Sequence, residues 1–144
     1  MSDSEHILIS LEPRHATNIL DGVKLVELRR RAMHVTPGST VWLYAKQPVG
    51  SVVGRALIAK THEAAPTTLW RRFSSVAGIS REEFFRYFEG VARGVALELT
   101  DAMRLATAIP LQDLQGPGVR FHPPQFFVRL APDHPVRNVV NRAA

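Results

Sequence analysis

The order of strand and helix signals along the chain is the feature that most limits its fold. Five or six short segments combine strand-forming residues with closing Gly or Pro turns, and only two or three helical segments interrupt them. Helices do not alternate regularly with strands, as they do in a doubly wound parallel sheet. We therefore predict an α+β fold: a small, mostly antiparallel β-barrel of five or six strands with two or three flanking helices.

The clearest strand signal is the alternating segment 40–45, and the clearest helix start is the capping box Ser80-Arg-Glu-Glu83. We expect strands at 6–11, 24–30, 40–45, 51–61, 95–99 and 126–130, with 106–110 as a candidate for a further short strand, and helices at 14–20, 66–73 and 81–89. Residues 1–6 are predicted to be a polar lead-in, residues 7–130 the folded domain, and residues 131–144 a loose basic tail.

Composition excludes several classes of protein. A chain of 144 residues can bury a sizeable core without staples, and the absence of Cys excludes disulfides, thiol nucleophiles and cysteine-built zinc sites. The histidines are scattered without a helical pair, so we expect no metal and no cofactor. No apolar run approaches the ~18 residues of a membrane span, and the N-terminus lacks a secretory pattern. These patterns predict a cytoplasmic protein.

The basic excess is concentrated in one type of side chain. Of 18 basic residues 15 are Arg, and the formal net charge is +5. Arg presents a planar fork that suits phosphates and carboxylates, although codon composition produces the same bias. Four of these residues, Lys24, Arg29, Arg30 and Arg31, lie in one short stretch around Glu27. Such a patch would attract an anionic partner such as nucleic acid. The alternative is that these charges protect the exposed edge of a sheet from pairing with another chain.

Several segments, taken in order, resemble the ASCH domain family. They are Ile7-Leu-Ile-Ser-Leu-Glu-Pro13, Gly22-Val-Lys-Leu-Val-Glu-Leu-Arg29, Val41-Trp-Leu-Tyr-Ala45, Gly78 to Gly90 and Pro123-Pro-Gln-Phe126. The resemblance covers roughly residues 6–130. It implies a PUA-like β-barrel, with a cleft between barrel and helices floored by the strand at 24–29. Members of the family are thought to bind RNA or modified nucleosides, some hydrolyse N4-acetylcytidine, and some are reported as ribonucleases.

The candidate site centres on Lys24, Glu27 and Arg29. On a strand, Glu27 and Arg29 share a face with Cβ atoms ~7 Å apart, whereas Lys24 has the opposite parity. Lys24 therefore reaches the same cleft only if the turn after Gly22 or a bulge redirects it. A carboxylate that accepts and a guanidinium that donates suit a nucleobase edge and its phosphate. The alternative is an ordinary solvated ion pair.

Four further residues are candidates for ligand binding. Arg30 and Arg31 extend the basic patch, Tyr44 carries a hydroxyl that can point to a polar site, and Gln125 follows two prolines in a loop. Core packing is the alternative for Tyr44, and a structural turn is the alternative for Gln125.

The resemblance also bears on catalysis. Amidohydrolase members use a Lys, a Thr three residues later and a carboxylate before the second main helix. Lys24 matches, but Glu27 occupies the Thr position and residues 76–78 carry no acid. We therefore expect a binding module for RNA, single-stranded nucleic acid or a modified nucleoside. The alternative is a small hydrolase, N4-acetylcytidine amidohydrolase-like or a ribonuclease, with Lys24 and Glu27 as catalytic residues. A regulatory domain that binds protein partners is a further alternative.

Overall fold

One six-stranded sheet forms the framework of the protein. The computed structural model describes residues 4–115 and 120–143, and the strand order is β2-β5-β4-β3-β1-β6. Only β1 and β3 pair in parallel; the other neighbouring strands are antiparallel. The strands are β1 His6–Leu11, β2 Val26–Arg29, β3 Thr40–Ala45, β4 Ser51–Ala64, β5 Gly94–Pro110 and β6 Phe127–Arg129. The predicted α+β, mostly antiparallel fold is confirmed, as an open half-barrel.

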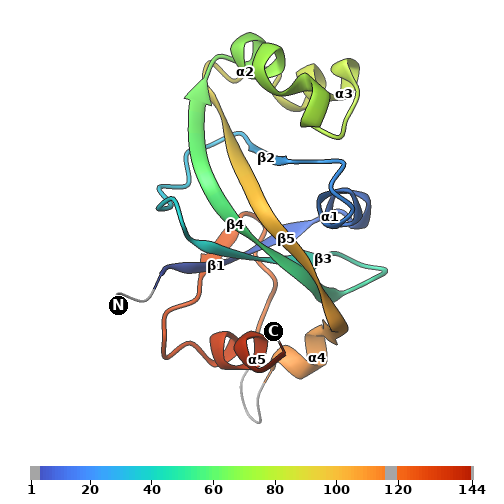
Figure 1. The fold of residues 1–144 in the computed structure, drawn as a ribbon, viewed down its shortest axis with the longest axis vertical. Coiled ribbons are helices and arrows are strands. Elements are labelled where there is room, and N and C mark those ends of the chain that lie inside the picture. Colours follow the sequence, from blue (N-terminus) through green and yellow to red (C-terminus); the bar gives the residue numbers. More distant parts are fainter. Residues whose placement is uncertain (1–3, 116–119, 144) are drawn as a thin grey trace.

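The two longest strands connect the ends of the molecule (Figure 1). Strand β5 is 17 residues long and covers both segments that the sequence analysis treated as separate strands, 95–99 and 106–110. The β4–β5 ladder contains three register shifts, which bend and twist the pair. One end of this pair carries α2 (Pro66–Phe73) and α3 (Arg81–Tyr87), linked by a 3-10 turn at Ser74–Val76.

Three further helices complete the domain, so the described residues contain five α-helices rather than the two or three predicted. Helix α1 (Pro13–Leu20) follows β1 directly and begins at a proline, whose missing N–H costs nothing in a first turn. Helices α4 (Leu111–Leu114) and α5 (Pro135–Ala143) lie at the end opposite α2 and α3 (Figure 1). Within the described residues, no helix is long and apolar enough to span a membrane.

Alternating side chains of the sheet supply two separate cores. One face of β3 places Val41 and Leu43 in a cluster with Ile9, Ile19 and Leu97, under α1. The opposite face packs Trp42 and Tyr44 with residues of α4 and α5. A third cluster joins β2 to the helical cap through Leu28, Leu69, Phe73, Phe84 and Phe88. The third cluster fixes α3 next to β2, which is the contact that shapes the site described below.

The C-terminal segment differs most clearly from the structure that its sequence predicts. The loose basic tail predicted for residues 131–144 is wrong for residues 135–143, which form α5; residue 144 lies outside the described residues. Val136 and Val140, one helical turn apart, are buried against the core that contains Trp42. The Arg137 guanidinium donates to the Leu130 carbonyl oxygen at 2.9 Å. Burial of one apolar stripe against the core therefore stabilises this helix, whose mostly polar composition did not predict it.

Val140→Asp is expected to destabilise the protein by about 3 kcal/mol or more, because it places a carboxylate in an apolar core without a partner. Urea unfolding followed by circular dichroism measures this change. Asn138→Asp adds the same charge to an exposed position of α5 and is the matched control. Equal midpoints for the two variants would show that α5 contributes nothing to the folded core.

Candidate functional site

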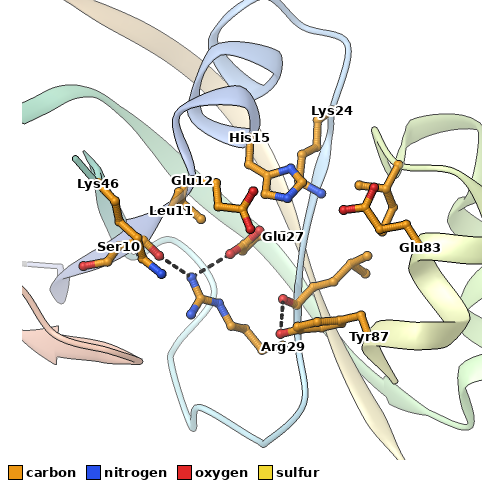
Figure 2. A pocket seen from close by; sticks show the side chains of 12 residues that line it. Ser10, Leu11, Glu12, His15, Lys24, Glu27, Arg29, Lys46, Glu83 and Tyr87 are labelled. Atoms are coloured by element: carbon orange, nitrogen blue, oxygen red, sulfur yellow. Dashed lines mark hydrogen bonds and ion pairs between the residues drawn. The ribbon is translucent and has the colours of Figure 1, made fainter. Parts of the chain in front are cut away.

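A polar pocket lies where the helical cap meets the sheet. It has a volume of about 170 Å³ and is bordered by the ends of β1 and β3, the start of α1, strand β2 and helix α3. Figure 2 shows its side chains converging from these elements. Three predicted residues, Lys24, Glu27 and Arg29, line it together. The other lining residues are Ser10, Leu11, Glu12, His15, Leu28, Lys46, Ile79, Glu83 and Tyr87.

Glu27 and Arg29 form a buried ion pair on the floor of this pocket. Their side chains share a face of β2, as predicted, and Arg29 Nη2 lies 2.6 Å from Glu27 Oε2. Arg29 also donates to the carbonyl oxygens of Ser10 and Phe126, both at 3.2 Å. Because β2 is one edge of the sheet and Phe126 precedes the strand at the other edge, Arg29 joins the two sides of the open half-barrel. Because Glu27 and Arg29 are both buried, the alternative that they form a solvated surface ion pair is excluded.

Lys24 reaches the pocket from the turn that precedes β2. The backbone at Gly22 has a φ of +79°, and β2 begins only at Val26, so strand parity does not apply to Lys24. Its side chain is 2% exposed, and Nζ donates to the Ala77 carbonyl oxygen at 2.6 Å. Gly78 permits this closure, since a Cβ there would lie 2.9 Å from the Lys24 Cβ. Burial lowers the pKa of Lys24, and the nearby Glu27 carboxylate partly opposes that shift.

His15, which the sequence analysis did not select, points into the same pocket from α1 (Figure 2). Its Nδ1 is buried and has no hydrogen-bond partner among the described residues. Burial lowers the pKa of His15, and the positive charge of Lys24 lowers it further. A histidine with a lowered pKa is neutral at physiological pH and can therefore accept a proton.

The carboxylates of the pocket are already paired, whereas its lysines are not. Arg14, at the start of α1, forms ion pairs with both Glu12 and Glu83, and it lowers the pKa of Glu83. Lys46 is exposed just after β3. Within residues 4–115 and 120–143, neither Lys24 nor Lys46 forms an ion pair with a carboxylate. The positive charge available to an incoming anion therefore resides on these two lysines.

The remaining predicted basic and loop residues line a second, adjacent pocket. Arg30, Arg31 and Gln125 border it, together with Arg29, Tyr87 and Phe126. Arg30 donates to the Glu89 carbonyl oxygen at 3.2 Å, and the Tyr87 hydroxyl donates to that of Leu28 at 3.1 Å. Arg29 and Tyr87 belong to both pockets and form the boundary between them. The predicted site is thus divided in two.

Tyr44 is the predicted site residue that the structure places elsewhere. It shares a face of β3 with Trp42, as predicted, but this face turns toward α4 and α5 rather than toward the pocket. The side chain is 3% exposed and packs in the second core, so the core-packing alternative holds. Burial raises the pKa of Tyr44. Strand parity identified its neighbours correctly, but it does not specify which face of a sheet borders a cleft.

The described part of the chain holds no group of three or more His, Asp or Glu side chains placed to bind a metal ion. The pocket instead offers a neutral imidazole, two lysines and a fixed guanidinium to a ligand.

The arrangement defines an α+β half-barrel domain with a polar pocket under a helical cap. Comparison with known proteins agrees with the fold and identifies the family. The chain is 35% identical over 123 residues to an ASCH domain-containing ribonuclease of Zymomonas mobilis, covering 85% of this chain and 82% of that protein. The crystal structure of ASCH from Zymomonas mobilis superimposes with a TM-score of 0.90 at 32% identity, over 99% of this chain and 98% of that one. The chain belongs to the ASCH domain family.

A second curated relative shares a smaller part. The large ribosomal subunit protein uL22 of Ureaplasma parvum is 27% identical over 94 residues, which are 65% of this chain and 30% of that protein. No family model matches the chain.

Proposed function

We propose that the protein binds RNA, with one nucleotide in the pocket that contains Lys24, and cleaves an RNA phosphodiester there. Membership of the ASCH family and the ribonuclease name of the Zymomonas mobilis relative support this class of substrate. The observation that carries the chemical step is the position of His15, a half-buried imidazole with a lowered pKa beside Lys24. The sequence favoured a module that binds RNA, and a ribonuclease was one of the alternatives; the proposed function combines the two.

The chemistry follows from the groups that the pocket brings together. In the proposed reaction the imidazole of His15 takes the proton of a ribose 2′-hydroxyl, and the resulting oxygen attacks the adjacent phosphorus. The bond to the 5′-oxygen breaks, and that oxygen receives a proton from the Lys24 ammonium. The products are a 2′,3′-cyclic phosphate and a free 5′-hydroxyl. One N–H of Lys24 is held by Ala77, which leaves two N–H groups for the substrate.

Lys46 and Arg29 have different roles in this proposal. Lys46 is exposed at the rim and offers its charge to the non-bridging phosphate oxygens, where negative charge grows in the transition state. Arg29 positions the floor of the pocket, because its guanidinium already binds Glu27 and two carbonyl oxygens. In this proposal Glu27, predicted above as a catalytic residue, instead fixes Arg29, because its carboxylate is already paired with that guanidinium.

A second candidate is hydrolysis of a nucleobase amide, as in N4-acetylcytidine. Lys24 favours it, because a buried lysine with a lowered pKa is suited to abstract a proton or stabilise an oxyanion. Incubation of the protein with a labelled single-stranded RNA and, separately, with N4-acetylcytidine distinguishes the two. We expect RNA fragments and no free cytidine. Cytidine release with intact RNA would select the second candidate, and inactivity on both substrates together with no RNA binding at ~50 mM salt would reject the site.

The rate of RNA cleavage is expected to rise with pH as His15 loses its proton. Because burial and Lys24 hold the pKa of His15 below its usual 6.5, the midpoint of this rise should lie below pH 6.5. At alkaline pH the rate should fall as Lys24 deprotonates, below the usual lysine value of 10.5. Initial rates between pH 4.5 and 10 measure both limbs. A rate that falls steadily from pH 5 to 7 would contradict His15 as the base.

A further inference from the structure

The second pocket differs chemically from the first. It has a volume of about 240 Å³, and the six described residues that line it include three guanidinium groups and no carboxylate. The guanidinium of Arg29 is paired with Glu27, so the charge offered to a ligand comes from Arg30 and Arg31. The first pocket combines acids, lysines and a histidine, with its acids already paired. The mixed lining suits a sugar and a base edge beside the scissile phosphate, whereas a lining whose charged groups are all positive suits a further phosphate.

An aromatic ring stands among these guanidinium groups. The Cζ atoms of Arg31 and Arg29 lie 4.7 Å and 5.8 Å from the centre of the Phe126 ring. Arg31 and Gln125 are exposed, and Phe126 is half-buried. A nucleobase can stack on a ring or on a guanidinium plane, and the Gln125 amide can both donate to and accept from a base edge. Phosphate and base together are what this lining would recognise.

The two pockets are contiguous, since Arg29 and Tyr87 line both. We propose that the second pocket binds the nucleotide next to the one whose phosphodiester is cleaved. This inference rests on the proposed function and specifies its substrate: an unpaired RNA strand of at least two nucleotides rather than a free nucleoside. A base must leave its helical stack to reach Phe126, so a continuous duplex does not satisfy the second pocket.

The test measures how affinity grows with strand length. Calorimetric titrations use 2′-O-methyl uridine 3′-monophosphate and the corresponding trinucleotide, because 2′-O-methylation removes the nucleophile and prevents cleavage during the experiment. We expect the trinucleotide to bind the unsubstituted protein at least tenfold more tightly, because one of its two further nucleotides places a phosphate and a base in the second pocket. Arg31→Ala should lose most of this gain.

Arg142→Ala, an exposed arginine of α5 at the opposite end of the molecule, is the matched control and should keep the gain. Gln125→Ala is the second test variant. Because the side chains of Arg31 and Gln125 are both exposed, both test variants should fold normally. A gain that persists in Arg31→Ala, or a trinucleotide no tighter than the mononucleotide, would overturn the second pocket while leaving the first intact. Failure of the unsubstituted protein to bind either ligand or RNA would instead overturn the proposed function.

Discussion

His15→Gln is expected to lower the rate of RNA cleavage by about 10² to 10⁴-fold, the usual contribution of a general base. Glutamine keeps much of the shape and polarity of the side chain but cannot take the proton of a 2′-hydroxyl. The affinity for RNA should change far less than the rate, because the charge that attracts the phosphate resides on Lys24 and Lys46. Single-turnover cleavage of a labelled RNA, with a parallel binding titration, separates the two effects.

His122→Gln is the control for this experiment. His122 is exposed and lies outside the residues that line the pocket, so its replacement should leave the rate within about twofold. Contaminating nuclease would give the same residual rate in every preparation, including His15→Gln. Equal rates for His15→Gln and the unsubstituted protein would remove His15 from the reaction.

Arg29→Met is expected to have the largest effect on stability, about 3–5 kcal/mol. The substitution leaves the Glu27 carboxylate in a buried position without its cation, and it also removes two hydrogen bonds that join β2 to the far edge of the sheet. Urea unfolding followed by tryptophan fluorescence measures the loss. A loss below about 1 kcal/mol would show that the pair is solvated and that Arg29 does not close the half-barrel.

The double variant Glu27→Leu with Arg29→Met separates charge burial from the structural connection. Removing both charges abolishes the uncompensated carboxylate, so the double variant should be more stable than Arg29→Met alone. The difference between it and the unsubstituted protein then reports the lost connection to Ser10 and Phe126.

Local patterns predicted much of the fold. The alternation in 40–45 and the turn residues around it predicted β3 with its correct bounds. The capping box predicted the start of α3, where the Ser80 hydroxyl accepts a hydrogen bond from the Glu83 backbone amide. The tail was missed because the amphipathic stripe of α5 contains only a few valines and is stabilised by contact with distant strands. Such contacts have no local signature.

The candidate site was predicted in part, for the same physical reason. The charged cluster and the family resemblance selected Glu27 and Arg29, and strand parity correctly placed both on one face. His15, Lys46 and Glu83 come from α1, the end of β3 and α3, and only the packing of α3 against β2 brings them together. Family resemblance pointed to Lys24 and included Gly78, but it did not indicate that Gly78 lets the cap close over Lys24.

Identification of the cleavage product tests the central claim most directly. The protein is incubated with a short single-stranded RNA, and the new ends are identified by mass spectrometry, with the 2′-O-methyl form of the same RNA as the control. We predict a 2′,3′-cyclic phosphate on one fragment, a 5′-hydroxyl on the other, and no cleavage of the 2′-O-methyl strand. A 5′-phosphate end, or cleavage of the 2′-O-methyl strand, would contradict a reaction that begins with proton transfer from the 2′-hydroxyl to His15.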